Sequence, residues 1–239
     1  AASDVYKRQE MLEEIRRFPD GGLHLEAGVQ SFYQPSLKAV SRRQDEQKTL
    51  DNLRFIREQT GAEIHADLVA GLPYSTYDTF SRDFDKLMAV RPQELQLGIL
   101  KRLRGAPIDR HSQVCAMVYS KYPPYEIMQN KDMSYAELQR IKRIARYLDI
   151  FYNSGNFPHT VELLLGAQAS CFAAMDDFSR FIWENYQQTH KISIGRQTRI
   201  LFEYLQKYYP LQEIATALLA DYDGKGRKDN VCYLREILK

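Results

Sequence analysis

Residues 62–73 read "AEIHADLVAGLP", an alternating apolar stretch that ends in Gly-Leu-Pro and predicts a strand followed by a loop. Ser75 or Thr76 can then cap a helix over 77–90, "YDTFSRDFDKLMAV". Upstream, "LHLEAGV" at 23–29 alternates in the same way, and the segment 46–61, "EQKTLDNLRFIREQTG", predicts a helix that Gly61 would end. Downstream, "PQELQLGILKRLRGAPI" at 92–108 predicts a third strand. This order of strands and helices is typical of parallel βα units, so the fold class expected here is α/β.

The pattern changes after Pro107. Residues 109–120 are compatible with a helix, and "PPYEIMQNKDM" at 123–133 predicts an edge strand or a connection because of its two prolines. From Ser134 onward apolar residues recur at helical spacing, which predicts an all-α region. The first helix carries the stripe Leu138, Ile141, Ile144, Ala145, Leu148 and Tyr152, and further helices are expected over 158–175, 176–189, 193–209, 211–222 and 229–238. We therefore expect an α/β domain at 10–107, a connection at 108–133 and a helical domain at 134–239.

The bulk composition excludes several classes of protein. The 239 residues carry 33 Lys and Arg against 31 Asp and Glu, a net charge of +2 that indicates neither nucleic acid nor an anionic membrane as partner. The apolar run at 161–175 is shorter than the roughly 20 residues that a bilayer requires, and Gln168 interrupts it. The three cysteines are odd in number and far apart, which argues against a disulfide framework and favours a reducing cytoplasm. They also lack metal-ligand spacing, and the five histidines are expected to be surface or packing residues.

The first nine residues raise a separate question. Residues 4–9, "DVYKRQ", match the translation of a transposon end that is used to fragment DNA for sequencing. Under this interpretation residues 1–9 are an artefact, native sequence begins near Gln9 or Glu10, and the protein extends upstream. The alternative is a native helix start with Ser3 as its N-cap.

Polar side chains stand where the predicted strands end. Ligands of parallel α/β proteins gather beyond the carboxyl ends of the strands, where the loops converge. Gln30 offers both a donor and an acceptor to sugar hydroxyls, and Asp67 accepts from hydroxyls or pairs with an ammonium group. Arg42 or Arg43 offers a planar fork to a carboxylate. A ligand with a ribose, an amino group and a carboxylate would satisfy all three positions.

Three segments together resemble one enzyme family. The stretches "LEAGVQSFYQPSLKAVSRRQ" at 25–44, "HADLVAGLP" at 65–73 and "LQLGILKRLRGAPI" at 95–108 resemble the second half of a radical S-adenosylmethionine (SAM) barrel. That resemblance implies strands four to six of a partial (βα)6 barrel over residues 10–107. The remainder, through "PPYEIM" at 123–128 and "IFYNSGNF" at 150–157, resembles the helical C-terminal extension of a subgroup that often carries an N-terminal cobalamin-binding domain.

The resemblance also implies roles for individual residues. Gln30 would contact the ribose of SAM, and Arg42 would pair with its methionine carboxylate, or Arg43 if the register slips by one. Asp67 would accept hydrogen bonds from the ribose or the amino group. Gly71 would let the backbone approach the adenosyl group. The apolar residues expected to flank the adenine are Val69 and Leu97.

The family motif C-x-x-x-C-x-x-C is missing from this chain. In the family its thiolates hold a [4Fe–4S] cluster that leaves one iron open to SAM, and reduction by a donor such as flavodoxin or ferredoxin yields a 5′-deoxyadenosyl radical. The resemblance thus implies an enzyme when the protein is complete, with SAM, a [4Fe–4S] cluster and, in this subgroup, cobalamin as cofactors and a substrate that is unknown. The chain alone is expected to be inactive.

Two other function classes stay open. In the first, the chain is a non-catalytic binding module, in which Gln30 and Asp67 only close turns. In the second, it belongs to an unrelated barrel enzyme that acts on a phosphorylated substrate, which the lack of a Gly-rich phosphate loop disfavours.

Overall fold

The computed structural model describes residues 9–103, 105, 107–225 and 231–239. The chain divides into two compact units, residues 1–145 and 146–239. The interpretation of residues 1–9 as an artefact falls almost wholly outside the described residues and stays a prediction. No helix within the described ranges is long and apolar enough to cross a membrane.

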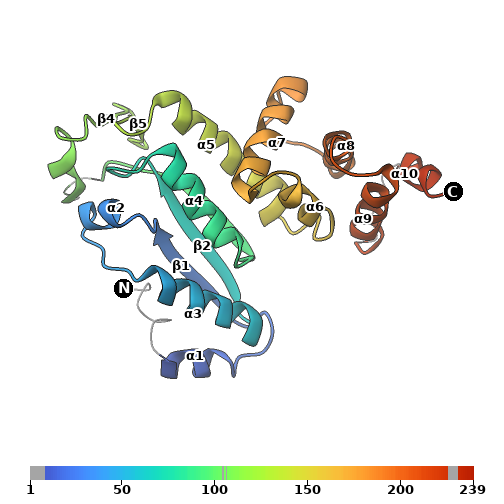
Figure 1. Cartoon of the computed structure of the whole chain (residues 1–239), viewed down its shortest axis with the longest axis horizontal. Coiled ribbons are helices and arrows are strands. Elements are labelled where there is room, and N and C mark those ends of the chain that lie inside the picture. Colours follow the sequence, from blue (N-terminus) through green and yellow to red (C-terminus); the bar gives the residue numbers. More distant parts are fainter. Residues whose placement is uncertain (1–8, 104, 106, 226–230) are drawn as a thin grey trace. The chain divides into compact units, whose positions relative to one another are not determined.

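The first unit is built on a parallel sheet, as the sequence predicts. Its strands are β1 (His24–Gln30), β2 (Glu63–Ala70) and β3 (Glu94–Ile99), in the order β1-β2-β3 (Figure 1). The register pairs the first residues of β1 and β2, His24 and Glu63, and sets Asp67 opposite Gln96 of β3. The α/β class is therefore confirmed, whereas closure of these strands into a larger barrel remains a proposal.

Helices cover one face of this sheet. The elements before β2 are α1 (Gln9–Ile15), α2 (Gln34–Ala39) and α3 (Glu46–Gln59), and α4 (Tyr77–Met88) follows it. Both α3 and α4 contact β2, whose residues alternate between buried and half-buried along the strand. Ile64, Ala66 and Leu68 are fully buried. His65 and Asp67 consequently point to the other face, which these helices leave open.

Capping residues fix where these helices begin. The Asp45 side chain accepts a hydrogen bond from the backbone N–H of Lys48 at the start of α3. Of the two caps expected for α4, Thr76 is the one used, in a reciprocal capping box with Thr79. Both helices thus start where the sequence predicts.

Gly61 serves a purpose other than the expected helix cap. Helix α3 ends at Gln59, and Thr60 is already extended, with φ −137°. A Cβ atom at position 61 would lie 2.1 Å from Asp20 Oδ1, and the Gly61 carbonyl accepts a hydrogen bond of 2.8 Å from the Gly21 N–H. Glycine is required here because the turn before β1 passes directly against the turn before β2.

The connection after β3 is less helical than expected. Pro107–His111 form a short 3₁₀ helix, and the rest of the predicted helix over 109–120 is a turn followed by β4 (Val118–Tyr119). The predicted edge strand is β5 (Ile127–Gln129), which pairs antiparallel with β4. Helix α5 (Tyr135–Leu148) then begins where the apolar stripe predicts it.

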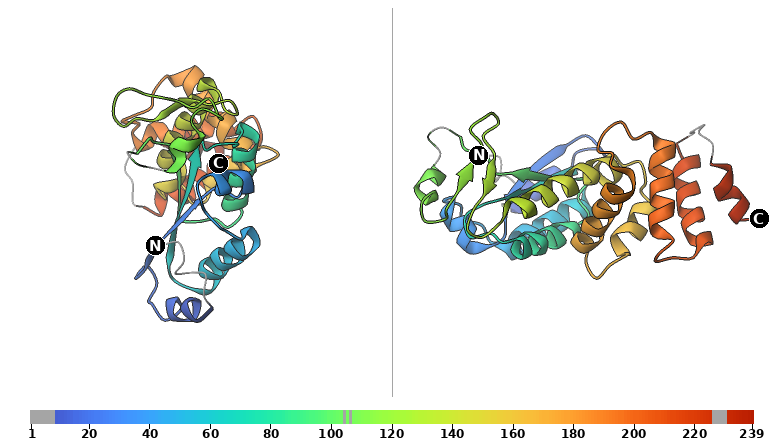
Figure 2. Two further views of the ribbon diagram at one scale, coloured as in Figure 1. Left: turned by 90° about the vertical axis from the view of Figure 1, so that its left-hand side faces the viewer. Right: turned by 90° about the horizontal axis from the view of Figure 1, so that it is seen from above.

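The second unit consists of helices. A π-helical segment, Asp149–Asn153, precedes α6 (Thr160–Gly166), α7 (Cys171–Tyr186), α8 (Ile194–Leu205), α9 (Leu211–Asp223) and α10 (Cys232–Ile237). Helix α8 packs against both α7 and α9 (Figure 2). The boundary expected between residues 175 and 176 is wrong, because the helix breaks before Ser170. The Ser170 side chain accepts from the Ala173 N–H and starts α7 there.

Candidate functional site at the carboxyl end of the sheet

Gln30 ends β1 in an unusual conformation. Its φ is 64°, in the left-handed region that a side chain disfavours, and the β1–β2 register shifts between Ala27 and Gln30. The extra residue on β1 is a bulge, a device that re-aims a side chain at a strand end. Gln30 borders a cavity of about 640 Å³ that Val69 and Leu97 also line. The structure thus brings three of the six predicted site residues together.

The side chains of Arg42 and Asp67 both lie close to Gly28. A Cβ atom at position 28 would lie 3.9 Å from Arg42 Nη2 and 3.9 Å from Asp67 Oδ2. Arg42 Nη1 also donates a hydrogen bond to the Gly28 carbonyl. Arg42 is half-buried, whereas its neighbour Arg43 is exposed. Of the two arginines that the sequence offers, Arg42 is therefore the one held beside Asp67.

The surroundings of Asp67 destabilise the charged form of its carboxyl group. Burial raises the pKa of the Asp67 carboxyl, and the nearby carboxylates of Glu26 and Glu94 raise this pKa further. His65 and Arg42 act in the opposite direction. Asp67 thus takes up a proton more readily than an exposed aspartate, and a ligand that brings positive charge or hydroxyl donors would be stabilised beside it.

Gly71 packs against protein atoms. Its φ is +85°, and a Cβ atom there would lie 2.5 Å from Ile127 Cγ2 on β5. The Gly71 carbonyl accepts a hydrogen bond of 3.1 Å from Asn130 Nδ2. The close approach that requires a glycine at this position is therefore made by the hairpin of β4 and β5. A contact between Gly71 and a ligand stays a prediction.

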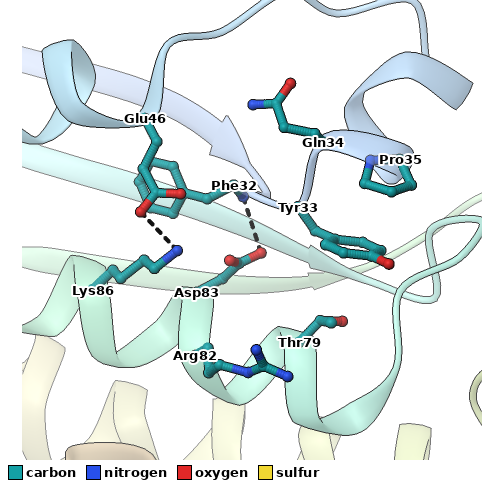
Figure 3. A pocket seen from close by; sticks show the side chains of 9 residues that line it. All are labelled: Phe32, Tyr33, Gln34, Pro35, Glu46, Thr79, Arg82, Asp83 and Lys86. Atoms are coloured by element: carbon teal, nitrogen blue, oxygen red, sulfur yellow. Dashed lines mark hydrogen bonds and ion pairs between the residues drawn. The ribbon is translucent and has the colours of Figure 1, made fainter.

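Asp83 holds the loop that follows β1, next to Gln30, and was not predicted from the sequence. It lies on α4, only 4% of its surface is exposed, and it accepts hydrogen bonds from Ser31 Oγ at 2.6 Å and the Phe32 N–H at 3.0 Å. Figure 3 shows Asp83 pointing at Phe32, directly after β1. Burial raises the pKa of Asp83, and these two hydrogen bonds oppose the rise. An aspartate within a helix gives no sequence signal for such a contact.

Two further features surround Asp83. Lys86, one turn later on α4, forms an ion pair of 2.7 Å with Glu46 at the start of α3 (Figure 3). A small cavity of about 270 Å³ lies among these side chains. Together these contacts tie α4 both to the loop after β1 and to α3.

Arg110 is a second residue that the sequence analysis missed. Its Nη2 donates to the Ala39 carbonyl at 3.0 Å and to Ser41 Oγ at 2.8 Å. Ser41 has a φ of 58° and directly precedes Arg42. Arg110 therefore holds the turn that presents Arg42, although the two lie far apart in the sequence.

We call Gln30, Arg42, Asp67, Val69 and Leu97 the carboxyl-end site. It combines an amide, a guanidinium and a carboxyl group with two apolar side chains at the end of a parallel sheet. Such a set can bind a polar ligand that carries both charges and an apolar ring. Of the described cysteines, Cys115 is buried in the first unit, and Cys171 and Cys232 belong to the second.

Comparison with known proteins gave two findings. A family model described as a protein of unknown function (DUF4080) matches residues 115–239, slightly more than half of the chain. The oxygen-independent coproporphyrinogen III oxidase of Pseudomonas aeruginosa is 36% identical over 70 residues. That match covers 29% of this chain and 15% of the oxidase, so the chain spans only a small part of this relative's length.

Proposed function

Because the chain belongs to the DUF4080 family, which is described only as a family of unknown function, we propose a function for it from the carboxyl-end site. In this proposal the chain is part of a radical SAM enzyme, and the carboxyl-end site binds SAM. The observation that carries the proposal is the approach of Arg42 and Asp67 to Gly28, in the carboxyl halves of β1 and β2. The partial similarity to an oxygen-independent oxidase supports an enzyme of this class.

The cavity that Gln30, Val69 and Leu97 line, which does not reach Arg42 or Asp67, suits the nucleoside part of SAM. Ligand pockets for small molecules measure roughly 300–1,000 Å³, and the cavity beside Gln30 has about 640 Å³. Its apolar lining includes Val69 and Leu97, which suit contact with an adenine ring. The cavity therefore has room for a nucleoside-sized ligand.

Each polar residue of the site would bind a different part of the cofactor. Arg42 keeps guanidinium donors beyond the one that binds Gly28, and these would pair with the methionine carboxylate. Asp67 would accept from the ammonium group or a ribose hydroxyl. Gln30 would bind the ribose from the bulge. With one electron from a [4Fe–4S] cluster held outside this chain, bound SAM would be cleaved to methionine and the 5′-deoxyadenosyl radical on which this class of enzyme depends.

The described cysteines do not fit a [4Fe–4S] cluster. Such a cluster requires several thiolates around one centre, and Cys115, Cys171 and Cys232 lack the C-x-x-x-C-x-x-C spacing that would supply them. In this proposal the cluster ligands, and any cobalamin, come from outside the chain, and flavodoxin or ferredoxin serves as electron donor. We further propose that residues 10–107 form strands four to six of the barrel and residues 134–239 a helical domain.

The test is a calorimetric titration of SAM into the chain and into two variants. Asp67→Asn is expected to weaken binding by about 10-fold or more, because a hydrogen bond to a charged group contributes about 1.5–3 kcal/mol. His190→Ala, at an exposed position in the second unit, is expected to bind SAM as the unmodified chain does. Equal losses in both variants would remove the site assignment. If the unmodified chain shows no saturable binding, the non-catalytic binding module becomes the better interpretation.

A further inference from the structure

Histidine and glutamate side chains gather at the opposite end of the same sheet. His24 and Glu63 are the first residues of β1 and β2 and are register partners, and His65 lies two residues further along β2 on the same face. Each offers one possible ligand atom, and these atoms all lie within 4.8 Å of one another. The helices α2 and α3 separate His24 from the other two in the sequence, and the parallel register brings them together.

The distances in this cluster suit a bound ion. His24 Nδ1 lies 2.9 Å from Glu63 Oε2, and the rings of His24 and His65 have their centroids 5.6 Å apart. A tetrahedral zinc ion with bonds of about 2.0–2.1 Å would space its ligand atoms by roughly 3.3 Å. Side-chain movements on the order of 1 Å would close this set around an ion.

A further carboxylate lies next to the cluster. Glu94 begins β3, is the register partner of His65, and places its Oε2 3.1 Å from His65 Nδ1. This contact leaves the other ring nitrogen of His65 available to a metal. A carboxylate that orients a ligating histidine in this way is a common feature of metal sites.

The charge and exposure of this face favour a cation. This face carries the carboxylates of Glu26, Glu63, Asp67 and Glu94. Among the described residues, Arg42 is a cationic side chain that lies close enough to interact with Asp67. The His24 side chain is 58% exposed and that of His65 29%. An ion can therefore reach the cluster from solvent, and the surrounding field attracts it.

We propose that His24, Glu63 and His65 bind one divalent first-row transition metal, with zinc as the best fit and Glu94 orienting His65. Two imidazoles select such a metal over magnesium or calcium, which prefer oxygen ligands. The ion would join β1 to β2 at their amino ends, roughly 20 Å from Gln30 at about 3.3 Å per residue, although Asp67 lies only two residues beyond His65 on the same face of β2. This inference does not depend on the proposed SAM site.

The test titrates Zn²⁺ into the 239-residue chain without SAM, in a Cys232→Ser background because the exposed Cys232 thiol competes for zinc. Binding of one equivalent is expected, together with a rise in melting temperature, since an ion that binds only the folded state stabilises it. The double variant His24→Ala/His65→Ala should lose at least 100-fold in affinity. The matched control His159→Ala/His190→Ala removes two histidines of the second unit and should bind zinc normally.

Two further measurements keep the proposal testable if the double variant folds poorly. Glu63→Gln preserves size and is expected to weaken binding at least 10-fold, whereas Glu58→Gln, on the exposed side of α3, should not. Co²⁺ as a second probe should give the intense visible absorption of a tetrahedral site, which excess Mg²⁺ should leave unchanged. The proposal is overturned if the Cys232→Ser chain shows no saturable zinc binding, or if Glu63→Gln and Glu58→Gln bind equally well.

Discussion

The two ends of the three-stranded sheet present polar side chains in different ways. At the carboxyl end, Arg42 comes from a loop and depends on Asp83 and Arg110 to hold the surrounding backbone. At the amino end, His24 and Glu63 belong to the strands themselves, and the register alone aligns them. Ligand binding at the carboxyl end should therefore weaken when distant supporting residues are substituted. Binding at the amino end should weaken only when the strands or their register are altered.

The largest expected effect is at Asp83. Asp83→Ala leaves the Ser31 hydroxyl and the Phe32 N–H without their buried acceptor, which should lower the free energy of unfolding by about 3 kcal/mol. Urea denaturation measures this. The control is Asp78→Ala. Asp78 is an exposed residue of α4 that forms an ion pair with Arg82, and its loss should lower the free energy of unfolding by less than about 1 kcal/mol. Similar losses in the two variants would mean that the loop after β1 does not depend on Asp83.

The next largest effect is a difference in SAM binding between variants of the neighbouring residues Arg42 and Arg43. Arg42→Ala should weaken SAM binding by about 10-fold, because it removes the half-buried guanidinium next to Asp67. Arg43→Ala should change binding less than about 2-fold. Neither should lower zinc affinity at the amino end, and loss of zinc affinity in Arg42→Ala would break the distinction between the two ends.

A smaller effect is expected at Arg110. Arg110→Ala removes two hydrogen bonds to the turn before Arg42 and should weaken SAM binding about 3-fold while zinc affinity is retained. The control is Arg16→Ala, since the side chain of Arg16, directly after α1, forms an exposed ion pair with Glu13. If SAM binding is unchanged in Arg110→Ala, Arg42 does not need this support.

The smallest expected effect is the contribution of Asp83 to the pH dependence of stability. Burial raises the pKa of Asp83 in the folded state above its unfolded value, so the folded state binds the proton first as the pH falls. The stability that this group contributes should therefore increase as the pH falls from neutrality through its folded pKa, until the pH reaches the unfolded pKa. Asp83→Asn should lack this component, which parallel urea denaturations of both chains between pH 4 and 7 would reveal. An identical pH dependence in the two chains would contradict the assignment.

Local patterns predicted much of the first unit. Period-two alternation located β1, β2 and β3, and threonine capping located α4, because these signals depend on neighbours in the sequence. The break before α7 was missed because Ser170 caps a helix within a nearly continuous apolar run. The segment 109–120 was misread because its turn follows from pairing between β4 and β5.

In the candidate sites, too, the sequence marks some residues and leaves others unmarked. Gln30, Arg42 and Asp67 stand out in the sequence because each lies at or just beyond the end of a predicted strand or turn. Asp83, Arg110 and the pair His24 and His65 acquire their neighbours only through tertiary contacts and strand register. Sequence spacing alone gave the histidines no shared role, since β1 and β2 are separated by α2 and α3.

The contact between Asp20 and Gly61 has a consequence for how this chain tolerates insertions and deletions. The turn at Gly21 is hydrogen-bonded to Gly61, so it sets where β1 starts relative to β2. One residue added between Asp20 and His24 would slide β1 by one position and exchange its two faces. The residue that precedes His24 would take its place opposite Glu63 at one end, and Gly28 would leave the position near Arg42 and Asp67 at the other. A single codon in this turn would thus disable both ends of the sheet at once.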